Sequence, residues 1–80
     1  MIAVRERERL MFSVILSKAD QVRRYSVSRL GDAGWLVTRE RDGEPPRQIC
    51  YHDWHRVERA LAIFRLEVSE LTAGGWSEVH

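Results

Sequence analysis

The chain has little cysteine, almost no lysine and almost no net charge. Its single cysteine, Cys50, excludes an internal disulfide framework and fits a reducing cytoplasm. The formal net charge is +1 at pH 7, so the chain as a whole has no strong attraction for nucleic acid or acidic lipid. No apolar run approaches the roughly eighteen residues that suggest a membrane-spanning helix. These absences predict a cytoplasmic protein outside the membrane.

The basic residues are nearly all arginine. Lys18 is the only lysine among 13 basic residues. Arginine can bind carboxylate or phosphate with two parallel hydrogen bonds, but the codon usage of a GC-rich bacterial genome produces the same bias. Both interpretations stay open at this stage.

The length allows one small domain. Of the 80 residues, 44% are apolar and 31% are charged, which is typical of a folded soluble chain. Arginine and glutamate alternate over residues 5–9, and neither a strand nor a helix there would bury these side chains. We expect a partly ordered charged leader over 1–9 and a single domain over 10–80.

The strongest periodicity lies between Asp53 and Gly75. Apolar residues recur there every three or four positions, as on one face of an α-helix. The carboxylate of Asp53 can cap the first turn, and the pair Gly74-Gly75 suits the end of a helix. The pattern predicts a long helix whose buried seam consists of Trp54, Val57, Leu61, Phe64, Val68 and Leu71.

Three stretches before the helix alternate apolar and polar residues, as half-buried strands do. They cover 22–30, 35–42 and 47–52 and are separated by turns over 31–34 and 42–46, which contain three glycines and two prolines. We expect an antiparallel meander with one face under the helix. The side chains predicted on that face are Tyr25, Val27, Trp35, Val37, Ile49 and Tyr51.

Residues 10–16 are apolar on both faces and fit either a fourth strand or a helix that continues from the leader. The residues after Gly75 are expected to fold back, with Trp76 packing on the end of the sheet. The predicted fold is therefore α+β, with a three-stranded antiparallel meander, or a four-stranded one, packed against one long C-terminal helix.

Two apolar residues of the predicted helix lie off its seam. Ile63 falls on the flank of the seam and Leu66 falls nearly opposite it. A single exposed leucine is ordinary, but two layers of so small a domain also leave one sheet face uncovered. We therefore expect a homodimer, with Ile63 and Leu66 in an interface of helix against helix or sheet edge against sheet edge. Another protein partner would fit the same surface.

Cys50, His52 and His55 are the residues with ligand-like chemistry. Cys50 and His52 share one face of the predicted strand and His55 enters the first helical turn, so three zinc-compatible donors would converge. The spacing matches no structural-zinc pattern, and the fourth ligand would be Asp53, His80 or water. Metal binding is thus an alternative. The simpler interpretation makes these residues ordinary strand and surface side chains, with no metal and no cofactor.

Nucleic-acid binding is a second alternative, because arginines are frequent in the predicted sheet. Trp35 and Tyr51 could stack bases, but their register assigns both to the core. Acidic residues also alternate with the arginines, which is typical of a solvated face. The residues for this alternative are Arg24, Arg29, Arg39, Arg41 and Arg47.

The segment ALAIFRLEVSELTAGGW, from Ala60 to Trp76, together with the strands before it, resembles the WGR family, in which a sheet is followed by a similar helix and a glycine-aromatic end. This resemblance covers less than a third of the chain and implies a DNA-associated module. The tryptophan-glycine-arginine tripeptide is missing, since Trp35 is followed by Leu36 and Val37.

The sequence has no catalytic motif. It contains no glycine-rich phosphate loop, no serine elbow and no pair of carboxylates at a spacing suited to acid-base catalysis. We therefore expect a non-enzymatic binding or assembly module that self-associates through its helix flank and sheet.

Overall fold

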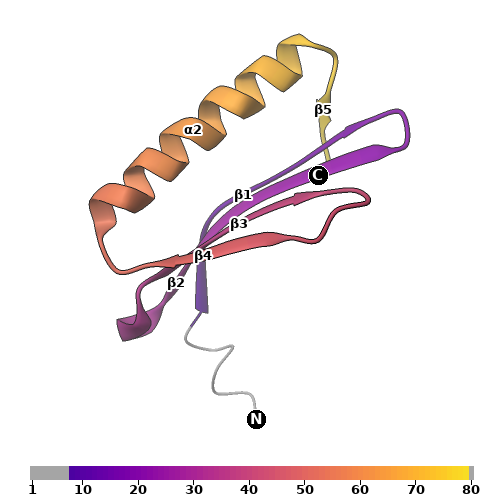
Figure 1. Ribbon diagram of the computed structural model, residues 1–80. Coiled ribbons are helices and arrows are strands. Elements are labelled where there is room, and N and C mark those ends of the chain that lie inside the picture. Colours follow the sequence, from indigo (N-terminus) through magenta and orange to yellow (C-terminus); the bar gives the residue numbers. More distant parts are fainter. Residues whose placement is uncertain (1–7, 80) are drawn as a thin grey trace.

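The computed structural model describes residues 8–79 and has two layers, an antiparallel sheet and one helix that lies on one of its faces (Figure 1). The five strands follow the order β4-β3-β2-β1-β5. The predicted α+β class and the meander are confirmed. The elements are β1 (Glu8–Lys18), β2 (Gln21–Leu30), the 3-10 turn η1 (Gly31–Ala33), β3 (Trp35–Arg41), β4 (Arg47–Tyr51), α2 (Trp54–Ala73) and β5 (Ser77–Glu78).

The ambiguous apolar stretch 10–16 belongs to strand β1. The strand begins at Glu8, so the last two residues of the predicted leader are part of the sheet, while 1–7 lie outside the described residues. A tight turn at Ala19 and Asp20 joins β1 to β2. Ala19 has a φ of 55°, which is unusual for a residue other than glycine. The apolar stretch is a strand because β2 pairs with it along nearly its whole length.

Helix α2 starts and ends as its sequence predicts. The Asp53 carboxylate accepts a hydrogen bond from the His55 N–H at 3.0 Å, so it caps the first turn. At the other end, the Gly74 N–H bonds back to carbonyl oxygens of the last turn, and Gly75 takes a φ of 102°. The chain can therefore reverse and return to the sheet.

The core lies between α2 and the middle strands. Val57 and Phe64 are the buried residues of the helix, and the Phe64 ring lies 4.9 Å from the ring of Tyr25. Leu61, Val68 and Leu71 pack partly buried around them, so the predicted seam is confirmed in its middle. Trp54 at the start of the seam is 37% exposed and packs on the ring of Trp35 at 5.5 Å. The core residues from the sheet and tail are Leu16, Tyr25, Val27, Val37 and Trp76.

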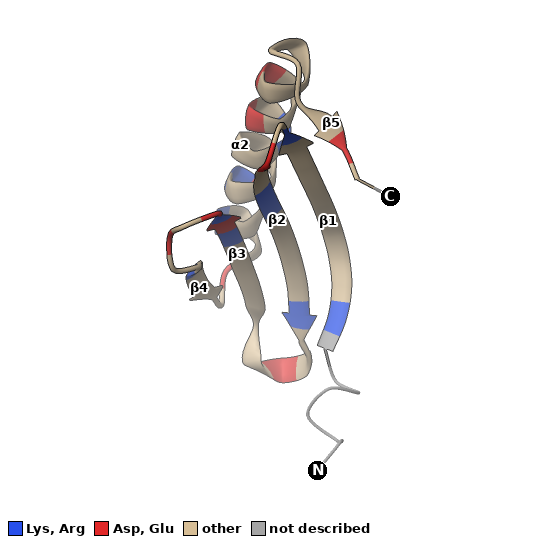
Figure 2. Cartoon of the chain, turned by 90° about the vertical axis from the view of Figure 1, so that its right-hand side faces the viewer, with Lys and Arg blue, Asp and Glu red and all other residues tan. Residues whose placement is uncertain are grey.

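The opposite face of the sheet has no helix over it among the described residues. One row across this face consists of small or polar side chains, since Ser13 pairs with Ser26, Ser26 with Thr38, and Thr38 with Gln48. Figure 2 shows β1, β2 and β3 side by side with charges mainly near their ends. The neighbouring row on this face contains Leu36 and the 65% exposed Leu10, so the open face is mixed in character.

The chain end returns to the sheet through Trp76, which is 8% exposed. The guanidinium carbon of Arg23 lies 4.9 Å from the centre of the Trp76 ring. Directly after Trp76, β5 pairs with β1 at Leu16 and Ser17. The predicted packing of Trp76 on the sheet is confirmed, whereas β5 was not predicted.

None of the described helices combines the length and the apolar character that a membrane span requires.

Candidate functional site

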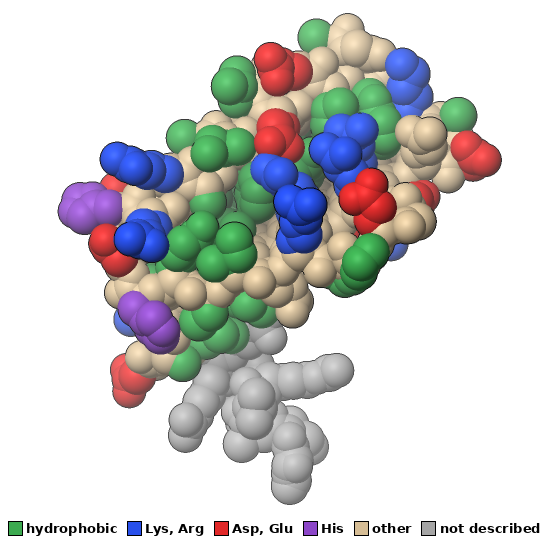
Figure 3. All heavy atoms as spheres, viewed as in Figure 1, with side chains coloured by type: hydrophobic (Ala, Val, Ile, Leu, Met, Phe, Trp, Pro, Cys, Tyr) green, Lys and Arg blue, Asp and Glu red, His purple; other side chains and the backbone are tan. Residues whose placement is uncertain are grey.

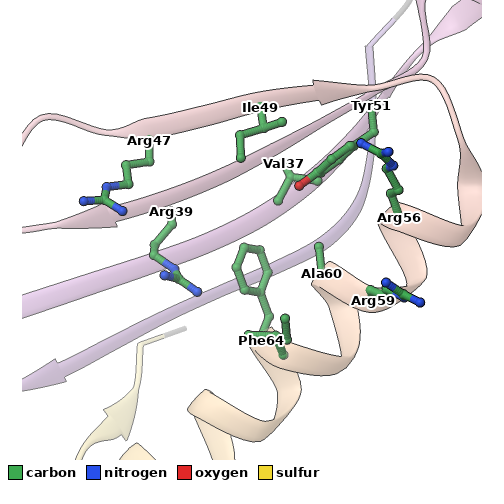
Figure 4. A pocket seen from close by; sticks show the side chains of 10 residues that line it. Val37, Arg39, Arg47, Ile49, Tyr51, Arg56, Arg59, Ala60 and Phe64 are labelled. Atoms are coloured by element: carbon green, nitrogen blue, oxygen red, sulfur yellow. The ribbon is translucent and has the colours of Figure 1, made fainter.

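A cleft of about 460 Å³ lies between the edge strand β4, its neighbour β3 and the helix α2 (Figure 4). Ile49 on β4 and Ile63 on α2 line it, and each is 51% exposed. Ile49 has the register predicted for the covered face, but the prediction that the helix buries it is wrong. The helix covers the middle strands and leaves β4 almost entirely exposed. The remaining apolar lining consists of Val37, Tyr51, Ala60 and Phe64.

Four arginines surround this apolar lining. Figure 4 shows Arg39 and Arg47 towards one end of the cleft and Arg56 and Arg59 towards the other, with Ile49 between them. Figure 3 shows the same side of the molecule, where apolar and basic side chains lie next to each other. No acidic residue lines the cleft as far as the structure describes the chain. Its electrostatic character therefore favours an anionic occupant.

Arg39 is held at the cleft by its contacts with the helix. Its Nη2 atom donates to Oε2 of Glu67 at 2.7 Å, and its guanidinium carbon lies 5.5 Å from the centre of the Phe64 ring. The Nε atom of Arg39 is buried and has no hydrogen-bond partner within residues 8–79. This atom is out of reach of a ligand in the cleft, but the Arg39 side chain as a whole is 31% exposed and can still contact an anion there.

The tyrosine ring that contacts Phe64 is buried in the core. Tyr25 is 1% exposed and packs under Phe64. Burial raises the pKa of Tyr25 above 10.0, and the neighbouring carboxylate of Glu67 raises it further. Tyr25 is therefore neutral at physiological pH and acts as part of the core.

Strand β4 is an edge of the sheet. It pairs with β3 from Arg47 to Tyr51, and no other described strand pairs with it. An edge strand presents unpaired N–H and C=O groups to solvent. The cleft thus combines a free backbone edge, an apolar lining and a basic rim.

Only one of the two predicted interface residues lines the cleft. Ile63 lines the cleft, whereas Leu66 is 61% exposed and lies on the side of α2 away from the buried seam. They are three positions apart on the same helix, so their side chains are neighbours, but Leu66 lies outside the cleft lining. The helical spacing of Arg56, Arg59 and Ile63, at i, i+3 and i+7, marks the flank that does form the site, and this signal was missed.

The five arginines of the nucleic-acid alternative are also divided. Arg39 and Arg47 line the cleft, and Arg41 lies beside them in a shallow depression near Pro45. Arg24 is on the open face opposite Glu40, and Arg29 is at the other end of β2, where its guanidinium carbon lies 5.5 Å from the Trp35 ring. Three of the five therefore share one side of the molecule.

The three candidate metal ligands have separate surroundings. The Cys50 thiol donates to the Ala33 carbonyl at 3.5 Å, and Nδ1 of His55 lies 3.6 Å from a carboxylate oxygen of Glu58. His52 is exposed next to Gly34. Across residues 8–79, no three histidine, cysteine, aspartate or glutamate side chains are placed to hold one metal ion.

No protein-family model, curated protein or solved structure matches this chain. The resemblance of its C-terminal part to the WGR family accordingly gains no support, and the functional argument depends on the cleft itself.

Proposed function

We propose that the protein is a non-enzymatic, cytoplasmic binding module that takes an extended segment of a partner protein into the cleft between β4 and α2. The segment adds a strand to the β4 edge and places alternate side chains into the cleft. The observation that supports this most strongly is the exposure of Ile49 and Ile63 beside an unpaired strand edge. Main-chain hydrogen bonds would supply affinity and the cleft would supply specificity.

β4 is better suited to strand addition than β1 at the other side of the sheet. A register shift between Leu10 and Phe12 interrupts the pairing of β1 with β2, and such bulges twist an edge away from further pairing. β5 already occupies part of that edge. β4 pairs with β3 in continuous register and has the cleft next to it.

A different protein fits this cleft better than a second copy of the chain. Joining two β4 edges would bring the arginine-rich rims of both copies together, and like charges repel. The predicted homodimer therefore stays a prediction for other surfaces, of which the one around Leu66 is the first to test by light scattering.

Random linear peptides displayed on phage and selected against the full-length protein test the proposal. Selected peptides should bind the Ile63→Lys variant about tenfold more weakly than wild type, because a charged side chain would enter the apolar lining. Leu66→Lys is the matched control, since it adds the same charge to an exposed position of the same helix. Failure to select any peptide, or binding that is insensitive to Ile63→Lys, would contradict the proposal.

A further inference from the structure

The arrangement of charge along the cleft constrains the sequence that could occupy it. Along β4, Arg47, Ile49 and Tyr51 point to the helix side, because successive side chains of a strand alternate between faces. Arg39 is the cross-strand neighbour of Arg47, so two guanidinium groups lie at the same end. The other end, beside Tyr51, has Arg56 nearby (Figure 4).

We propose that the partner segment has acidic side chains on both sides of a central apolar residue, in the order acidic–x–apolar–x–acidic. This inference rests on the proposed function, since it requires the segment to lie as a strand along β4. Residues at every second position of an added strand face the cleft. The central apolar residue then lies between Ile49 and Ile63, and one acidic residue reaches the arginines at each end.

The hydrogen bonding of the arginines supports a carboxylate as the anionic group. Within residues 8–79, Arg47, Arg56 and Arg59 form no ion pair, and Arg39 pairs with Glu67 through Nη2 while its side chain stays 31% exposed. A planar carboxylate presents two acceptor oxygens that match the donor fork of a guanidinium. A carboxylate between Arg39 and Arg47 would accept hydrogen bonds from the guanidinium of Arg47 and from the exposed part of Arg39.

The chain itself does not contain this pattern. Glu40 and Glu44 are its only two acidic residues separated by four positions, and Asp42 stands between them in place of an apolar residue. A second copy cannot therefore supply the segment. The partner is a different protein with a short acidic and apolar strand.

Three capped synthetic peptides test this inference by fluorescence anisotropy with the full-length protein. The first contains Asp-Thr-Ile-Thr-Glu, the second replaces both acids by their amides as Asn-Thr-Ile-Thr-Gln, and the third replaces the isoleucine by serine. The acidic peptide should bind about tenfold more tightly than the amide peptide, and its affinity should fall as salt screens the charges. The serine peptide should also bind about tenfold more weakly.

Arginine variants locate the effect on the protein. Arg47→Gln should remove most of the preference for the acidic peptide over the amide peptide. Arg24→Gln, which removes the same charge from the open face, should retain it. Equal binding of the acidic and amide peptides, or equal sensitivity to both variants, would overturn the inference.

The remaining outcomes separate this inference from the proposed function. If phage-selected peptides bind at the cleft but none of the synthetic peptides does, the acidic pattern is wrong and the binding module stands. If the serine peptide binds as tightly as the isoleucine peptide, and a DNA oligonucleotide displaces both, the surface is a general polyanion site and the inference is overturned. If neither selected nor synthetic peptides bind, both proposals fail.

Discussion

Arg39 on β3 and Glu67 on α2 form an ion pair across the sheet and helix layers, with 2.7 Å between Nη2 and Oε2. The pair lies next to the cleft, and each side chain is about one-third exposed, at 31% and 28%. It ties the helix to the sheet on the side where the helix leaves β4 uncovered. It also makes Glu67 a carboxylate that competes with an incoming acidic ligand for Arg39.

Glu67→Gln should therefore affect stability and binding in opposite directions. The amide still accepts a hydrogen bond but loses its charge, so we expect unfolding to become easier by about 0.5–1 kcal/mol. The affinity for the acidic peptide should rise about threefold, because Arg39 is no longer neutralised. Urea unfolding and anisotropy measure the two effects, and Glu70→Gln on the exposed side of the helix is the control. A loss of affinity in Glu67→Gln would be inconsistent with competition for Arg39.

Phe64→Ala should be among the most destabilising substitutions in the helix. Phe64 is 3% exposed and contacts Tyr25, so we expect a loss of about 3–4 kcal/mol. Leu61 shares the sequence pattern of Phe64 but is only partly buried, so Leu61→Ala should cost less, about 2 kcal/mol. Glu70→Ala should be near neutral. Equal losses at Phe64 and Leu61 in urea unfolding would show that the buried seam is centred elsewhere.

Gly34 and Gly43 allow a matched test of the two sheet turns. Both have positive φ, 104° and 81°, so alanine is strained at either position. A side chain at Gly34 would also collide with the Tyr51 carbonyl oxygen, whereas nothing lies near Gly43. Gly43→Ala should cost about 1 kcal/mol and Gly34→Ala at least about 2 kcal/mol more. Similar melting temperatures for the two variants would mean that the backbone at Gly34 does not approach β4 as described.

Tyr25 should make the stability fall at high pH. Its pKa in the folded chain is raised by burial and by Glu67, so the fold favours the neutral phenol. This contribution is complete below pH 10 and is lost as the pH rises through the raised pKa. Above about pH 10, urea midpoints of wild type should fall more steeply than those of Tyr25→Phe, which has no proton to lose. Parallel curves would contradict this assignment.

The sequence alone predicted the parts of the fold that depend on local periodicity. The helix followed from its apolar spacing and its cap at Asp53, and the strands followed from alternation. β5 was missed because two residues cannot show a period, and its position depends on the burial of Trp76. The 10–16 stretch was ambiguous because a strand and a helix can both bury a short apolar run.

The cleft was harder to predict because it depends on how the helix crosses the sheet. Ile49 has the same alternation as Val37, yet Val37 is buried and Ile49 is exposed. The difference arises from tertiary packing, because the helix lies over β3 and not over β4. The sequence shows only the helical spacing of Arg56, Arg59 and Ile63. This spacing identifies one flank of the helix but does not show which strand faces it.

The most direct test of the central claim is a titration of the ¹⁵N-labelled full-length protein with a phage-selected peptide, followed by backbone NMR. We expect the shifts to concentrate in 47–51 and along the flank of α2 from Arg56 to Ile63, and amide exchange along β4 to slow as its free edge becomes paired. Shifts centred on the open face around Ser26 and Thr38, or unchanged exchange along β4, would contradict the account.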